Sequence, residues 1–256
     1  MTRNIDIGAI VSKVFETYRQ YAGVLLPIAA VLFLIEAVFS YLGIDSTGLA
    51  LVASLIGIVL STLYTGMVVE LVNDTRDGRL DQSVGGLVRS VGPVILPLIG
   101  LSIVVGIAVA IGFILIIVPG LILITIWAVA APAVVVERKG IFEALGRSRE
   151  LVKGNGWQVF GVIILFFLIF FVIGLVLGAL GAALGDAGQV ILGWVGRVAT
   201  APLVALAAAI LFFELKSSKG ETAAVAGPPA GAPIAGFDAP ESPSSAPPPP
   251  PPAPGV

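Results

Sequence analysis

The chain has 256 residues, of which 57% are hydrophobic and 12% are charged. Soluble domains carry about 25% charged residues, so this composition excludes a water-soluble enzyme and a nucleic-acid-binding protein and indicates a polytopic membrane protein. The net charge of −2 adds little, but the absence of His and Cys excludes histidine-dependent catalysis, Cys/His metal sites and disulfides. We therefore expect a protein that is not an enzyme and that holds no cofactor, catalytic residue or metal ligand.

Six segments are long and apolar enough to cross a membrane, for which about 20 residues are needed. The apolar run 91–136 is too long for one crossing. Pro119-Gly120 predicts a hairpin turn within it, because Pro ends a helix and Gly accepts turn geometry. The six predicted spans are Ala22–Tyr41, Leu49–Val69, Val94–Val118, Leu121–Val136, Val159–Leu184 and Val190–Phe213.

The basic residues distinguish the two ends of these spans. All of the 14 Lys and Arg residues except Arg197 precede span 1, separate spans 2 and 3 or spans 4 and 5, or follow span 6. The three alternate loops contain none. Short segments rich in Lys and Arg stay in the cytoplasm, so we expect a multi-pass protein of the plasma membrane with both termini cytoplasmic.

An amphipathic segment precedes each odd-numbered span. Its apolar residues follow helical spacing, which is typical of helices in the membrane interface, although simple elbows between hairpins would look the same. The first two hairpins also begin with related sequences, Val24–Ile28 and Val94–Leu98. The predicted fold is all-α, with six transmembrane helices as three parallel hairpin repeats. The apolar positions are Ile7, Ile10, Val11, Val14, Phe15 and Tyr18; Val84, Leu87, Val88 and Val91; and Ile141, Phe142, Leu145 and Val152.

Two charged residues lie well inside the predicted spans, Glu36 in span 1 and Arg197 in span 6. A charge at the middle of a membrane helix costs on the order of 2.5–3.5 kcal/mol. Both residues lie at about the same depth below the loops that lack basic residues. We therefore expect an intramembrane ion pair, which would either close the helix bundle or form a gated polar site.

Small residues in and after span 5 predict close helix packing, because they let two backbones approach. The contact could lie within the bundle or between two copies of the chain, so the oligomeric state stays open. The residues are Gly174, Gly178, Gly181 and Gly185.

The character of the sequence changes after Glu214. Twelve of the 18 prolines fall between Pro228 and Pro254, a composition that buries too little apolar area to fold. The predicted domains are a six-helix transmembrane domain, residues 1–215, and a disordered proline-rich cytoplasmic tail, residues 216–256. The tail could instead bind an aromatic-lined groove of a partner.

Two stretches resemble a known family. Residues Glu143–Trp157 read EALGRSRELVKGNGW before an apolar span, and Val14–Arg19 read VFETYR before the first span. Together with Pro119-Gly120 and Ala131-Pro132, they resemble the bacterial six-helix family called the glycerophosphoryl diester phosphodiesterase membrane domain, over residues 4–215. Catalysis in such proteins belongs to a separate barrel with histidines, and this chain has no His. The resemblance implies the fold, a bacterial membrane and a link to lipids, but no hydrolysis.

Two functions of different classes fit these observations. The first is a non-catalytic scaffold, assembly or lipid-interacting module of the cell envelope, whose partners are the lipid bilayer and either anionic lipids or another membrane protein. The second is a small-molecule transporter or channel component, whose polar groups would be Glu36, Arg197 and the span 2 hydroxyls of Ser54, Ser61 and Thr65. Basic residues before span 5 could contact lipid headgroups, although acidic residues are interleaved with them: Arg138, Lys139, Arg147, Arg149 and Lys153.

Overall fold

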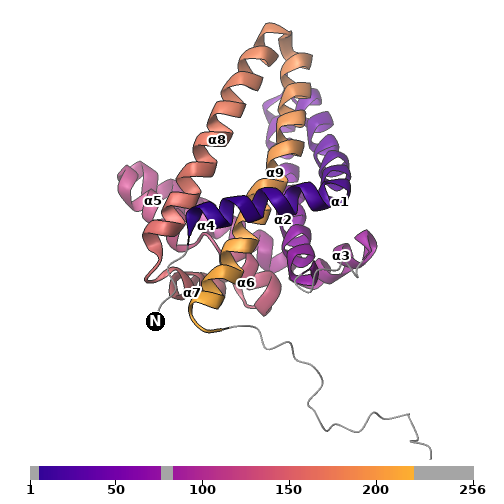
Figure 1. The fold of residues 1–256 in the computed structure, drawn as a ribbon. Helices are drawn as coiled ribbons and strands as arrows, with labels where there is room; N and C mark the ends of the chain where they lie inside the picture. Colours follow the sequence, from indigo (N-terminus) through magenta and orange to yellow (C-terminus); the bar gives the residue numbers. More distant parts are fainter. Residues whose placement is uncertain (1–5, 76–82, 222–256) are drawn as a thin grey trace, which may run out of the picture. The chain divides into compact units, whose positions relative to one another are not determined.

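The computed structural model of the chain describes residues 6–75 and 83–221, and their regular structure is helical throughout (Figure 1). The α-helices differ widely in length, and one 3-10 turn joins α3 to α4. The helices are α1 (Ile7–Leu42), α2 (Thr47–Asp74), α3 (Val84–Val91), η2 (Gly92–Val94), α4 (Ile95–Leu115), α5 (Ile117–Ile126), α6 (Ala130–Glu137), α7 (Ile141–Val152), α8 (Gly156–Ala183) and α9 (Gly185–Ser218).

Six helical segments are long and apolar enough to cross a membrane, in agreement with the number of spans predicted from the sequence. The chain is thus compatible with a multi-pass membrane protein. Two of the segments are composite, since one joins α3 to α4 and another joins α5 to α6. The segments are Ile7–Leu42, Thr47–Asp74, Val84–Leu115, Ile117–Glu137, Gly156–Ala183 and Gly185–Ser218.

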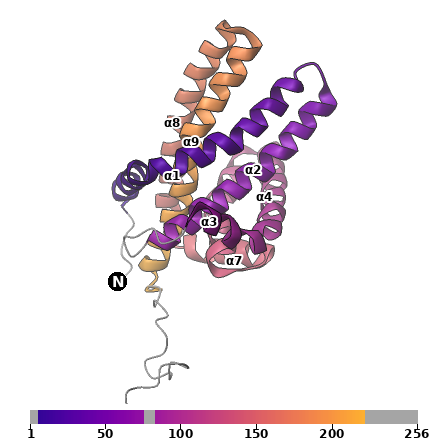
Figure 2. The ribbon, with the colours of Figure 1, turned by 90° about the vertical axis from the view of Figure 1, so that its right-hand side faces the viewer.

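The first amphipathic segment is not a separate helix, because it continues into the first span as α1. Asp6 caps the start of α1, where its side chain accepts a hydrogen bond of 2.8 Å from the Gly8 N–H. The two views show α1 changing direction along its length (Figures 1 and 2). Pro27 lies inside the helix, and a proline there removes one backbone hydrogen bond and bends the helix.

The turn between α4 and α5 falls at Ile116, not at Pro119-Gly120 as the sequence predicted. Ile116 is extended, with φ −164° and ψ 147°. Pro119 lies in the first turn of α5, where its missing N–H costs no hydrogen bond, so it marks a helix start rather than an end. Gly120 is needed for close approach, because a Cβ there would lie 2.7 Å from the Phe113 ring.

The predicted fourth span, Leu121–Val136, is interrupted between α5 and α6 at Trp127–Val129. Two of the backbone groups at this break bond to Ser148 of α7, which is fully buried. Its hydroxyl donates a 2.8 Å hydrogen bond to the Ile126 carbonyl and accepts a 3.3 Å bond from the Val129 N–H. Helix α7 therefore holds the broken span in place, because unpaired backbone groups inside a membrane protein are costly.

Consecutive helices pack as the pairs α1–α2, α4–α5 and α8–α9, and α9 also packs along α1 and α2. In Figure 1 the α1–α2 and α8–α9 hairpins extend upward, whereas the α4–α5 hairpin extends to the left. The three hairpins thus do not share one direction, and the predicted parallel repeat stays a prediction. The shared core includes Leu25, Phe33, Tyr64, Leu206 and Phe212.

The chain divides after Glu221 rather than after residue 215. Helix α9 continues to Ser218, and the compact unit includes residues as far as Glu221. The predicted disordered tail, 216–256, therefore begins inside the compact unit, and its remainder, 222–256, lies outside the described residues.

Candidate functional site

Glu36 and Arg197 lie against each other as an ion pair between α1 and α9. The Glu36 side chain is 16% exposed and the Arg197 side chain 52% exposed. Within the described part of the chain, Glu36 Oε2 is the one buried side-chain oxygen that accepts no hydrogen bond. The contact is therefore a charge pair without a well-aligned hydrogen bond.

The helices around this pair make room for it. A Cβ at Gly57 of α2 would lie 2.7 Å from Glu36 Oε1, so only glycine leaves space for the carboxylate. The Arg197 guanidinium lies 5.9 Å from the centre of the Phe33 ring, which is cation–π range. Trp194 Nε1 donates a 3.2 Å hydrogen bond to the Ala30 carbonyl, a second contact between α9 and α1 near the pair.

A cavity of about 460 Å³ reaches from the ends of α1 and α9 down to this pair. Its polar lining is Ser40, Asp186 and Gln189 together with the pair, and its apolar lining includes Phe33, Val190 and Trp194. Pockets of this volume accept small molecules or parts of larger ones. We call it the hairpin-end cavity, because it lies near the turns 43–46 and 184–185.

The predicted packing glycines divide into two groups. Gly181 is packed, since a Cβ there would lie 2.9 Å from the Gln189 Cα, and Gly185 forms the turn with φ +77°. Gly174 and Gly178 face open space, so the packing predicted for them is wrong within this chain. They share a face with Gly181, but α8 and α9 diverge away from their turn (Figure 1), so only the glycines near the turn meet α9.

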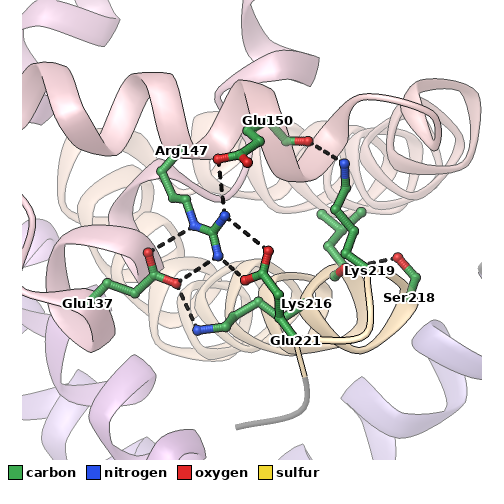
Figure 3. Close-up of polar contacts among 8 residues, drawn as sticks. Glu137, Arg147, Glu150, Lys216, Ser218, Lys219 and Glu221 are labelled. Atoms are coloured by element: carbon green, nitrogen blue, oxygen red, sulfur yellow. Dashed lines mark hydrogen bonds and ion pairs between the residues drawn. The ribbon is translucent and has the colours of Figure 1, made fainter.

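The opposite end of the unit holds a denser polar cluster around Arg147 of α7 (Figure 3). The Arg147 side chain is 13% exposed. Its Nε donates to Glu137 at 3.0 Å, and its Nη1 donates to Glu150 at 3.1 Å and to Glu221 at 3.2 Å. The Glu221 carboxylate, together with those of Glu137 and Glu150, holds the pKa of the Arg147 guanidinium above its ordinary value. Arg147 therefore joins α6, α7 and the segment after α9.

Two lysines complete this cluster, which we call the Arg147 cluster (Figure 3). Lys216 Nζ donates a 2.7 Å hydrogen bond to Glu137 and lies 5.3 Å from the centre of the Phe212 ring. Lys219 Nζ donates a 2.6 Å bond to the Glu150 carbonyl. The end of α9 is thus fastened to α6 and α7 by charged side chains.

A second connection at the same end involves Glu70 of α2, which the sequence analysis did not single out. Its side chain is only 6% exposed and pairs with Arg138 at 2.6 Å. Arg138 also donates a 2.9 Å bond to the Ser90 carbonyl at the end of α3. Arg138 has φ 53°, and this left-handed turn directs the chain from α6 toward α7.

The predicted headgroup contacts fall into two groups. Arg138 and Arg147 are engaged within the protein, and their guanidinium groups serve packing between helices. Arg149 and Lys153 are exposed and Lys139 is half-buried. Headgroup binding stays a prediction for these three.

Sequence reasoning missed Glu70 and Ser148, and it did not pair Arg147 with Glu137 and Glu221. Glu137 and Arg147 are separated by a left-handed turn, so no helical spacing relates them. The signal for the break at Trp127–Val129 was Pro132, which lies in the first turn of α6 just as Pro119 lies in that of α5. Both prolines mark helix starts within the apolar run.

Removing the C-terminal segment should affect stability only if Lys219 and Glu221 are removed with it, because both belong to the Arg147 cluster. We expect truncation after Glu221 to leave the thermal unfolding midpoint of the detergent-solubilised protein unchanged. Truncation after Ser218 should cost about 1–2 kcal/mol, less than the roughly 3–5 kcal/mol typical of a buried pair, because the Glu221 side chain is 36% exposed and Arg147 keeps two other partners. Equal midpoints for the two truncated chains would contradict a role for Glu221.

Within residues 6–75 and 83–221, no group of three or more acidic side chains is placed to hold a metal ion. The polar contacts are instead concentrated in two places. One is the Glu36–Arg197 pair with its cavity, and the other is the opposite end of the unit around Arg138 and Arg147, which we call the basic end. Comparison with protein-family models, with curated proteins and with solved structures gave no match.

Proposed function

We propose that the protein is a non-catalytic membrane module, a scaffold, assembly or lipid-interacting protein of the bacterial cell membrane with both termini in the cytoplasm. The observation that carries this proposal is the use of the polar side chains. At the basic end, Arg138 and Arg147 form ion pairs that connect helices. Charged groups that are paired in this way stabilise an arrangement of helices and are poor acids, bases or nucleophiles.

The apolar surface supports the same proposal. Large hydrophobic side chains are exposed along α1, α4 and α8, for example Val31, Ile107 and Phe167. In a membrane these faces meet acyl chains, and the diverging hairpins increase the area that lipid can cover (Figure 2). The resemblance to the glycerophosphoryl diester phosphodiesterase membrane domain agrees with a lipid-related role without requiring a reaction.

A small-molecule transporter or channel component is the second candidate, and the hairpin-end cavity is the observation that favours it. The cavity ends at Phe33 and Arg197. Below this level on α1, α2 and α9 lie Leu25, Ala29, Tyr64 and Leu206, which are buried and packed. Transport would require this core to open.

Reconstitution of the full chain in liposomes distinguishes the two candidates. We expect proton flux, followed with an entrapped pH-sensitive dye, and chloride flux, followed with a chloride-sensitive dye, to equal those of protein-free liposomes. We also expect phospholipid to remain bound after detergent exchange, as measured by native mass spectrometry. Flux that is abolished by Gly193→Leu, which narrows the cavity, would favour the transporter.

A further inference from the structure

We propose that the hairpin-end cavity binds the phosphate group of a membrane phospholipid and that Arg197 is the phosphate ligand. The inference rests on the proposed lipid-interacting function and specifies its site. It depends on three observations, namely the exposure of Arg197, the depth of the ion pair in the membrane, and the lining of the cavity.

Arg197 faces the cavity, whereas Glu36 lies behind it. Glu36 is packed against Gly57 and is mostly buried, while half of the Arg197 side chain is exposed. The pair engages Arg197 Nη1, and a guanidinium carries five N–H donors. Donors therefore remain for a second anion, and the planar guanidinium suits a phosphate with two parallel hydrogen bonds. The buried Glu36 keeps the guanidinium in place.

The ion pair lies just inside the hydrocarbon boundary of one leaflet, from where a long arginine side chain can reach a headgroup phosphate. On α9, the residues from Val198 to Phe213 are uncharged, and Glu214 follows them. At 1.5 Å per residue, these 16 residues span about 24 Å, somewhat less than the roughly 30 Å of the hydrocarbon core. On α1, an uncharged stretch of the same length separates Arg19 from Glu36. With Glu214 at one surface, Arg197 therefore lies a few ångströms inside the hydrocarbon boundary of the opposite leaflet, close enough for its side chain to reach the headgroup region.

The lining of the cavity suits an amphiphile. Apolar side chains of α1 and α9 line its walls, and polar ones line its mouth. The α1–α2 and α8–α9 hairpins diverge toward their turns (Figure 2), so a lipid can enter sideways from the bilayer. An acyl chain can then lie along exposed apolar residues on the core side of the pair, such as Val31 and Leu34.

The charge at the mouth selects among headgroups. Asp186 lines the cavity. It lies at the start of α9, eleven residues or about 16 Å of helix before Arg197. Its carboxylate attracts an ammonium group that projects outward from the phosphate, whereas a phosphoglycerol headgroup carries the same phosphate charge and offers no cation. We therefore expect a zwitterionic headgroup such as phosphoethanolamine to bind better than the anionic phosphoglycerol headgroup.

Gly193→Leu tests the site without removing either charge. Gly193 lines the cavity, and a Cβ there meets nothing within 4 Å, so leucine fills the cavity without a clash at its first carbon. Gly178→Leu on α8 is the matched control, because that position also faces open space but lies outside the cavity. A helical glycine is replaced in both variants, so their helix propensities change alike.

The experiment is native mass spectrometry of the full chain with defined lipids added at equal concentration. We expect phosphatidylethanolamine to be retained at least fivefold more than diacylglycerol, which has no phosphate, and severalfold more than phosphatidylglycerol. Gly193→Leu should lower retention at least fivefold, and Gly178→Leu should not change it. Soluble phosphoethanolamine at millimolar concentration should compete only weakly, because it has no acyl chain to bury.

Three results would overturn the inference. Equal retention by the Gly193→Leu and Gly178→Leu variants would place the lipid elsewhere, and equal retention of diacylglycerol would exclude the phosphate as the recognised group. Complete displacement by soluble phosphoethanolamine would identify a site for a free headgroup rather than for a lipid. In all three cases lipid still binds and the proposed function stands, whereas failure of the wild-type protein to retain any lipid would reject both.

Discussion

Arg147→Gln is expected to produce the largest loss of stability of any single substitution of a charged residue, about 3 kcal/mol. Removal of one partner from a buried charge pair typically costs about 3–5 kcal/mol. We expect a value at the lower end of this range, because Glu150, one of the partners of Arg147, is exposed and can be solvated by water. The substitution leaves Glu137 with Lys216 alone and releases Glu221 from α7. Ser148 of α7 also bonds to the backbone at the break between α5 and α6. If α7 is held less firmly, the interrupted span should therefore be disturbed as well.

Arg149→Gln is the matched control for this prediction. Arg149 lies on the same helix and is exposed, and exposed charges contribute about 0–1 kcal/mol. Thermal unfolding in detergent, followed by a fluorescent probe of aggregation or by circular dichroism, compares the two variants. Similar midpoints for Arg147→Gln and Arg149→Gln would mean that the Arg147 cluster does not hold α7 to α9.

The second large effect is expected at the intramembrane pair, and it should be asymmetric. Arg197→Gln strands Glu36, which is mostly buried, and should cost about 2–3 kcal/mol. Glu36→Gln leaves Arg197, whose half-exposed side chain can reach water or headgroups, and should cost about 1 kcal/mol. The double variant should lose clearly less than the sum of the two losses, because neither charge is then left alone.

A double-mutant cycle in nanodiscs measures this coupling. Asp45→Asn serves as the control, because Asp45 is exposed in the turn between α1 and α2. Strict additivity of the two substitutions would show that the pair contributes no coupling energy, and an equal loss for each would contradict the difference in burial.

The sequence predicted the features that depend on composition and on distance along one helix. The six spans follow from apolar length, and the gathering of basic residues at one end is visible in the Lys13–Glu214, Arg138–Glu70 and Arg147–Glu221 pairs. The matching depth of Glu36 and Arg197 could be counted along two helices, and the structure places the two residues side by side.

Features that depend on the relative direction of helices could not be read in this way. Gly174 and Gly178 lie on the right face of α8, but the helices have already diverged where they occur. Glu70 lies near the end of α2, and nothing in the sequence marks it as buried, yet it is 5% exposed and pairs with Arg138. Pro119 was expected to end a helix, whereas it lies in the first turn of α5, as Pro132 lies in that of α6. Each error concerns what a residue meets across space.

One accessibility measurement tests the membrane arrangement on which the whole account depends. Since the chain has no Cys, single cysteines can be introduced at Asp45, Asp186 and Lys153, all of which are exposed. Ser148 is unsuitable, because it is fully buried and would escape labelling on either side of the membrane. A membrane-impermeant thiol reagent added to intact cells should label Asp45→Cys and Asp186→Cys and should label Lys153→Cys only after the membrane is permeabilised. Labelling of Lys153→Cys in intact cells would contradict six crossings with the basic end in the cytoplasm.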